Sequence, residues 1–291
     1  MSTQWGGPLR RMCWHVSWWA RFLGWRVLDT VLHGDFGHKL AALALEAACR
    51  GDSGRFTHAL GAAGDLTEFD AGTIAVIALA AYTTGDQALA ERLFEEALAR
   101  GPENAEVMVC YGSYLQRNGN CKEGIAFLER GLKADPGDAT ALSWLGNAYY
   151  ASGNLLRARE CYEASIRLEG QGNGESYMGL AFVAGKEGKS DEELRLWREA
   201  TARMPHDAMA WYNLGDALYL AGQWNRAIRA FRKSLDLKWE KPHYALYGIA
   251  VSYMEVGNVQ DARRFCVRAL EAKPDYELAS QLLEEIEAEA K

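Results

Sequence analysis

A period of 34 residues runs through most of the chain and constrains its fold more than any other feature. It divides the sequence into seven units, residues 37–70, 71–104, 105–138, 139–172, 174–207, 208–241 and 243–276. Position 15 of the unit is glycine throughout, at Gly51, Gly85, Gly119, Gly153, Gly188, Gly222 and Gly257. Self-similarity at such a period indicates a repeat array, in which each unit is one supersecondary element stacked on its neighbours.

The residue preferences within the unit predict a helical hairpin. Apolar residues at positions 4, 7 and 11 share one helical stripe, and glycine at position 15 supplies the left-handed residue that ends a helix. Small residues at positions 8, 20 and 27 let two helices approach closely. A large residue at position 24 fills the gap between them, with Cys266 as the exception. Proline at position 32 ends the second helix in four units.

The stretch "WYNLGDALYLAGQWNRAIRAFRKSL" carries this pattern most fully and resembles the tetratricopeptide repeat (TPR) family. Its matching residues are Trp211, Leu214, Gly215, Ala227, Phe231 and Ser234. The resemblance implies an all-α, right-handed α-solenoid of about seven hairpins, with residues 277–291 as a C-terminal capping helix. The departures from the pattern are Phe56 and Glu193 at position 20, Gly170 and Trp239 in place of proline, and the extra residue Asn173.

Composition excludes several function classes. A net charge of −7 opposes electrostatic binding of nucleic acid. The six cysteines show no paired spacing, which suits a reducing compartment. The histidines are dispersed, with His206 and His243 at repeat boundaries, and the G-x-G-x-G at residues 170–174 follows no strand. We therefore expect a non-catalytic protein without cofactor or metal site.

The TPR resemblance also implies a concave groove lined by the first helix of each hairpin. The lysines of the family's clamp for acidic tails are absent at position 5, where Ser143, Met178 and Tyr212 stand. Aromatic residues dominate instead, which favours an apolar partner segment, helical or extended; the alternative is that these aromatics pack between hairpins. The predicted groove residues are Trp144, Asn147, Tyr150, Met178, Phe182, Lys186, Tyr212, Asn213, Asp216, Tyr219, Tyr244 and Tyr247.

Residues 1–36 form a separate segment rich in tryptophan and arginine. On a helical wheel this segment is apolar nearly all round, so it needs cover. Its arginines argue against a signal peptide and a membrane-spanning helix, whereas tryptophan beside arginine suits a membrane interface. The predicted anchor residues, for a membrane surface or a membrane-protein subunit, are Trp14, Trp18, Trp19, Arg21, Phe22, Trp25 and Arg26. Packing against the first repeats, or against a soluble partner, are the alternatives.

These patterns together predict a protein–protein interaction scaffold, assembly factor or accessory subunit, attached peripherally on the cytoplasmic side of a membrane. The competing prediction is a soluble cytoplasmic adaptor or co-chaperone whose N-terminal helix caps its own solenoid.

Overall fold

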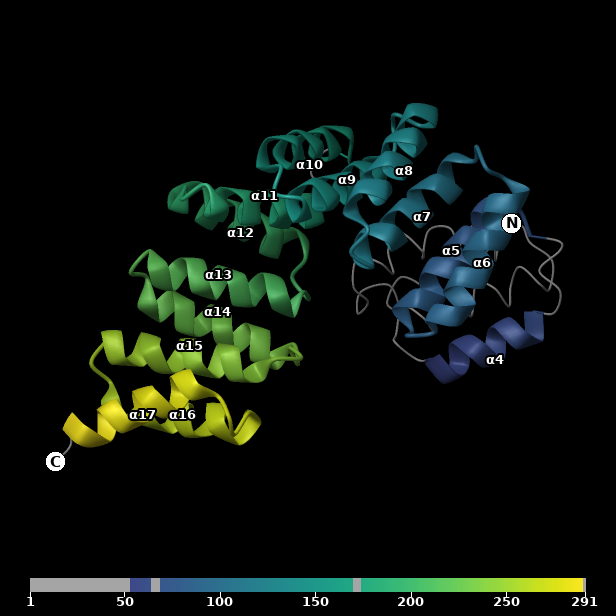
Figure 1. Ribbon diagram of the computed structural model, residues 1–291. Coiled ribbons are helices and arrows are strands. Elements are labelled where there is room, and N and C mark those ends of the chain that lie inside the picture. Colours follow the sequence, from purple (N-terminus) through teal and green to yellow (C-terminus); the bar gives the residue numbers. More distant parts are fainter. Residues whose placement is uncertain (1–52, 64–68, 170–173, 290–291) are drawn as a thin grey trace, which may run out of the picture. The chain divides into compact units, whose positions relative to one another are not determined.

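The computed structural model describes residues 53–63, 69–169 and 174–289. Residues 1–36, with the predicted anchor Trp14, Trp18, Trp19, Arg21, Phe22, Trp25 and Arg26, lie outside them, as does the inserted Asn173. The described residues contain fourteen helices and no strand (Figure 1). These helices are α4 (Ser53–Ala63), α5 (Ala71–Thr83), α6 (Gln87–Arg100), α7 (Ala105–Arg117), α8 (Cys121–Ala134), α9 (Ala139–Ala151), α10 (Leu155–Glu169), α11 (Gly174–Lys186), α12 (Ser190–Arg203), α13 (Ala208–Leu220), α14 (Trp224–Asp236), α15 (Pro242–Glu255), α16 (Val259–Ala272) and α17 (Glu277–Glu289).

The helices pair into hairpins, and the predicted all-α solenoid class is confirmed. The chain divides into two compact units, unit 1 (residues 1–170) and unit 2 (residues 171–291), which we describe separately. Unit 1 contains α4 and the hairpins α5–α6, α7–α8 and α9–α10. Unit 2 contains the hairpins α11–α12, α13–α14 and α15–α16, and α17 packs against α16.

The turn inside each hairpin depends on the glycine at position 15. All six of these glycines among the described residues have positive φ, from 68° at Gly222 to 89° at Gly85. Only glycine adopts this left-handed conformation without a steric penalty, so it ends the first helix and reverses the chain. Helices α5, α7, α9 and α13 begin at polar caps. The Asp70 carboxylate accepts from the backbone N–H of Thr73 at 2.9 Å, and Asp207 accepts from that of Ala210 at 2.8 Å.

Within a hairpin, the small residue at position 8 meets the large residue at position 24. A Cβ atom added to Gly146 would lie 2.6 Å from a ring carbon of Tyr162, and one added to Gly215 would lie 2.6 Å from a ring carbon of Phe231. Tyr162 and Phe231 are each only 1% exposed. In these two hairpins the helices therefore touch backbone against ring, which leaves no room for a side chain at Gly146 or Gly215.

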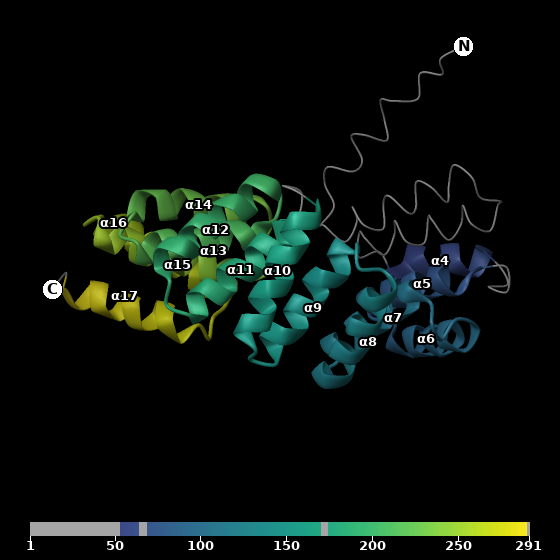
Figure 2. The same ribbon diagram turned by 90° about the horizontal axis from the view of Figure 1, so that it is seen from above.

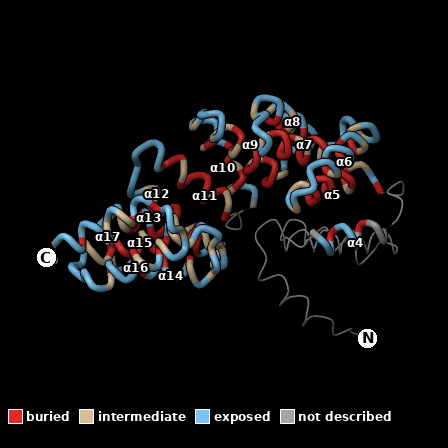
Figure 3. The backbone as a smooth tube through the Cα atoms, turned by 60° about the horizontal axis from the view of Figure 1, so that its bottom comes forward, coloured by how far each residue is buried: buried red, intermediate tan, exposed pale blue. Residues whose placement is uncertain are grey.

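The core of unit 1 is centred on α5, whose residues from Ile74 to Ala81 are all buried. Figure 3 shows this helix largely in the buried colour. Phe56 and Leu60 of α4 belong to the same core. Phe56 is fully buried although a small residue is usual at its position, so the packing of α4 differs from that of the later second helices.

Unit 2 is built in two layers. Seen from above (Figure 2), α12, α14 and α16 lie on one side of the unit, and α11, α13 and α15 lie on the other. The layer formed by α11, α13 and α15 carries most of the residues predicted to bind a partner. None of the described helices in either unit is long and apolar enough to cross a membrane.

Candidate partner-binding surface

Helix α13 carries two separate stripes of side chains. Residues 211, 214 and 218 form one stripe, and residues 212, 216 and 219 form the other, because positions three and four apart share a face of a helix. Leu214 and Leu218 are buried, whereas Tyr212 and Tyr219 are half-buried. The second stripe, which also contains the exposed Asp216, is therefore the more open of the two.

Tyr212 begins a continuous row of aromatic rings across unit 2, which we call the aromatic strip (Tyr212, Trp239, Tyr244, Tyr276 and Tyr247). Tyr212 stacks on Trp239 with 4.2 Å between ring centroids. Tyr244 follows at 6.1 Å from Trp239. Tyr276 then lies 5.6 Å from Tyr244 and 5.6 Å from Tyr247. These distances lie in the range of favourable ring contacts, so the strip is a pre-formed apolar surface.

The loop between α14 and α15 places Trp239 in the strip. Lys238, just before it, has a φ of 58°, the only positive φ of a non-glycine residue in the described parts of the chain. This conformation costs a non-glycine residue on the order of 1–2 kcal/mol. The ring of Trp239, which stacks on Tyr212, occupies the position where four other repeats have proline.

The strip stays partly open to solvent. Tyr244 is 37% exposed, and Tyr212, Trp239 and Tyr247 are half-buried, whereas Tyr276 is 8% exposed and supports the others from below. Burial raises the pKa of the Tyr276 phenol to about 12, with a smaller contribution from Tyr247. The Tyr276 phenol is therefore a neutral donor at physiological pH.

Two carboxylates lie beside the strip. Asp216 keeps surface open to solvent, but the atoms around it remove much of the water that would solvate its charge, and this desolvation raises its pKa. Desolvation also raises the pKa of Glu193, and the charge of Asp216 adds to the effect. Glu193 fits at a position that is usually small because it faces Gly185, where a Cβ would lie 2.9 Å from its Oε1.

The other predicted residues of unit 2 are partly engaged within the protein. Tyr219 donates a hydrogen bond to Glu255 Oε1 at 3.2 Å, which joins α13 to α15. Asn213 Nδ2 donates to the Met209 carbonyl at 2.8 Å. Phe182 packs edge-on against Trp197 at 4.9 Å, and Lys186 is exposed. Tyr219 and Asn213 thus line the surface with their polar groups already hydrogen-bonded.

Two predicted groove residues are buried instead. Trp144 is 2% exposed in the core of unit 1, and Met178 is 8% exposed in α11 of unit 2. In unit 1, Asn147 Oδ1 accepts a hydrogen bond from the Tyr162 hydroxyl at 2.7 Å, and Tyr150 is half-buried. Trp144 and Met178 therefore contribute to packing, and the open part of the predicted set consists of its exposed and half-buried members.

Three residues of this surface, His243, Tyr276 and Trp239, were not predicted from the sequence to belong to it. His243 and Tyr276 face each other at 5.1 Å, and His243 also lies 4.3 Å from Tyr244. Burial lowers the pKa of His243, and the charge of Lys273 lowers it further. From the sequence, His243 is expected only to lie at a repeat boundary. Trp239 was visible in the sequence as a departure from proline, and that exception was the available signal.

An all-α array of hairpins with a partly open aromatic surface on one layer defines a helical-repeat solenoid. Models of the tetratricopeptide repeat match residues 76–139, 111–175 and 208–238. The chain therefore contains tetratricopeptide repeats, as the motif in residues 211–235 predicted.

Similar proteins share this architecture. The peroxisomal targeting signal receptor of Eremothecium gossypii is 25% identical over 61% of this chain and 37% of its own length. The chain spans less than half the length of the curated relatives it matches. Among solved structures, the APC/C hetero-tetramer Cut9–Hcn1 matches 92% of this chain and 52% of its own with a TM-score of 0.72 at 18% identity. YrrB, described as a TPR protein with an unusual peptide-binding site, matches 65% of this chain and 96% of its own with a TM-score of 0.54 at 23% identity.

Proposed function

We propose that this protein is a non-catalytic interaction scaffold that binds an apolar segment of a partner protein on the aromatic strip of unit 2. The observation that carries the proposal is the strip itself. Its rings are held in place by one another before any partner arrives, so binding orders few side chains. Exposed aromatic clusters supply most of the binding energy in protein interfaces.

The relatives support the same class of function. A receptor for a targeting signal and a repeat protein with a peptide-binding site both recognise segments of other proteins, as their names state. Asp216 and Glu193 add desolvated negative charge beside the strip. A partner segment with bulky apolar side chains and no acidic residue next to them fits this surface best.

The test is affinity capture from cell extract with two tyrosine variants. Combining Tyr212→Ala, Tyr244→Ala and Tyr247→Ala removes three rings of the strip and should abolish capture of the main partner. The matched control is Tyr253→Ala, which lies on α15 as well but stacks on Phe265 at 5.7 Å, away from the strip. If both variants capture the partner equally and keep their helix content, the partner does not bind on the strip.

We further propose that residues 1–36 attach this scaffold peripherally to the cytoplasmic side of a membrane or to a membrane-protein subunit. The support is the apolar surface of the segment, with its tryptophans and arginines, in a chain that is otherwise acidic. Replacing Trp14, Trp18 and Trp25 by serine in the full chain should move the protein from the membrane fraction to the soluble one. If the wild-type protein already fractionates as soluble and ignores anionic vesicles, the segment caps the protein's own repeats or binds a soluble partner.

A further inference from the structure

A second surface lies on the other layer of unit 2, between α12 and α14. Both helices pack on α13, and a furrow of about 430 Å³ runs between them. Its floor is apolar, made by Trp211, Leu214, Leu218 and Ala230. Its walls carry four basic side chains, which are Arg198, Arg226, Arg229 and Lys233. We call this site the basic furrow.

The four cations of the basic furrow have no carboxylate within ion-pair distance among the residues that the structure describes. Arg198 and Arg226 instead donate to one neutral acceptor, Gln223 Oε1, at 3.3 Å and 2.8 Å. All four are exposed, so each keeps free N–H donors. Such concentration of unpaired positive charge is unexpected in a protein with a net charge of −7.

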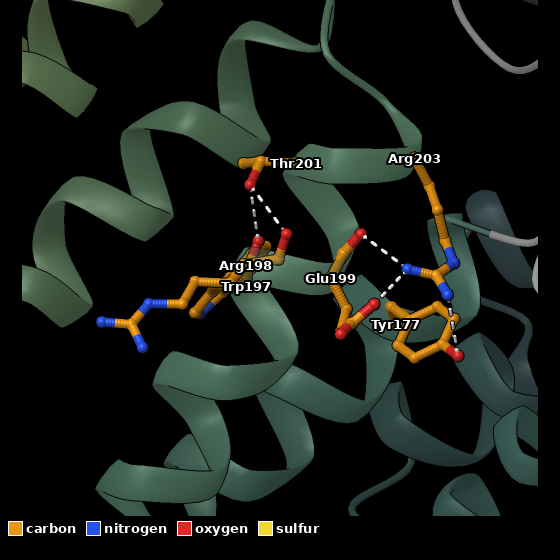
Figure 4. Close-up of polar contacts among 6 residues, drawn as sticks. All are labelled: Tyr177, Trp197, Arg198, Glu199, Thr201 and Arg203. Atoms are coloured by element: carbon orange, nitrogen blue, oxygen red, sulfur yellow. Dashed lines mark hydrogen bonds and ion pairs between the residues drawn. The ribbon is translucent and has the colours of Figure 1, made fainter.

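Arg203, on the same helix as Arg198, shows the contrast (Figure 4). Its guanidinium donates to Glu199 and to the Tyr177 hydroxyl, and it lies over the Tyr177 ring at 4.1 Å. Arg198 points to the opposite side of α12, away from this paired group. Arg203 is therefore paired with a carboxylate, whereas Arg198 lines the furrow.

The basic furrow is separate from the aromatic strip. Its floor uses the 211, 214 and 218 stripe of α13, whereas the strip uses the stripe that contains Tyr212 and Asp216. The strip is built on α13, on α15 and on the residues that follow α14 and α16, whereas the furrow lies between α12 and α14. A partner can therefore bind in the furrow while another occupies the strip.

Charge and shape together select the occupant. The walls attract a polyanion, but an extended one, such as nucleic acid or an anionic bilayer, would also face the acidic remainder of the protein. Leu214, Leu218 and Ala230 of the floor are buried, so a side chain that enters the furrow finds apolar contact there. From these observations we infer that the basic furrow docks an acidic peptide segment of a partner protein, with glutamate or aspartate on the walls and an apolar side chain on the floor.

The test uses a fluorescein-labelled synthetic peptide with a leucine pair flanked on both sides by glutamates, titrated with the full-length protein. The furrow variant Arg198→Glu/Arg229→Glu is compared with Lys122→Glu/Lys133→Glu, which reverses two exposed cations in unit 1 and changes the net charge equally. We expect the furrow variant to bind at least about tenfold more weakly than wild type and the control to match wild type. Replacing the peptide's glutamates by glutamine, or its leucines by serine, should each weaken binding, and added salt should weaken the glutamate peptide.

Equal affinity of the two double variants would overturn the proposal. So would binding to phosphatidylserine vesicles without binding to the peptide, which would assign the basic furrow to lipid. Concentration-dependent self-association that only the furrow variant loses would assign it to a second copy of this chain. Since none of these variants alters the aromatic strip, failure here leaves the proposed function untouched, and circular dichroism checks that each variant remains helical.

Discussion

The furrow between a second helix and the hairpin that follows it occurs in both units, with opposite charge. In unit 1, between α6 and α7, it has a volume of about 480 Å³ and is lined by Glu91 and Glu95. In unit 2 it is lined by Arg198 and three further cations. Glu95 and Arg198 occupy the same position, 25, of their repeats. The second helix of a repeat therefore carries negative charge beside the furrow in unit 1 and positive charge beside the furrow in unit 2.

The two furrows also differ in how their aromatic residues are used. In unit 1, Tyr114 lies 4.9 Å from Phe94 and donates to Glu91 at 3.0 Å, so ring and carboxylate are joined inside the furrow. Burial raises the pKa of Tyr111 there, and Glu123 and Glu95 add to the effect. In unit 2 the aromatic strip lies on the opposite layer. The same core positions thus recur in both units, while the surface positions differ between them in charge and in aromatic residues.

The largest expected effect tests whether the cores of the two units depend equally on the large residue at position 24. Phe231→Ala in unit 2 removes a buried ring held between Gly215 and Gly248, and Leu128→Ala in unit 1 empties the same repeat position. We expect losses in the free energy of unfolding of about 3–5 kcal/mol for Phe231→Ala and about 2–5 kcal/mol for Leu128→Ala. Urea denaturation followed by circular dichroism measures both. A loss below about 1 kcal/mol in either unit would mean that position 24 does not have the same role in both cores.

A smaller effect separates crowding from backbone conformation within unit 1. Gly146→Leu places a side chain against Tyr162 and should cost about 1–3 kcal/mol through overpacking. The matched change is Gly153→Ala in the next turn, where nothing lies near the added Cβ but φ is 82°; it should cost about 1–2 kcal/mol through strain alone. Thermal melting that leaves Gly146→Leu unchanged from wild type would mean that the two helices do not touch there.

These core features are the ones that could be predicted from the sequence. Position 8 is small and position 24 is large for reasons internal to one hairpin, so Gly146 and Tyr162 reveal their contact through the period alone. The turn glycines follow from the same local logic. Repetition makes each of these inferences stronger, because several units must satisfy the same geometry.

The surfaces could be predicted only in part, because they depend on which positions neighbouring hairpins bring together. Trp144 was predicted to line the groove, but its place in the core of unit 1 buries it. Trp239 reaches the strip only through the left-handed residue before it, which no pattern signals. The basic furrow combines position 25 of one repeat with positions 19, 22 and 26 of the next, a pairing invisible in either repeat alone.

The smallest effect sharpens the description of the unit 2 surface. Desolvation raises the pKa of Asp216 in the folded protein, so its ionised form opposes folding at neutral pH. Asp216→Asn should therefore stabilise the protein at pH 7 by less than about 0.5 kcal/mol, given the open position of the side chain. The gain should shrink as the pH falls toward about 3.9, the ordinary value of aspartate, because the folded state protonates first. Denaturation at pH 7 and pH 4 measures it, and a variant less stable at pH 7 would contradict the assignment.

The central claim is that a partner lies on the aromatic strip, and site-specific photo-crosslinking tests it most directly. A photo-reactive phenylalanine analogue is placed at Tyr244 in one variant and at Tyr253 in another, both on α15. The account predicts that the partner crosslinks from position 244, which is part of the strip, and not from position 253, which packs against Phe265. Crosslinking from position 253 alone, or equally from both, would contradict it.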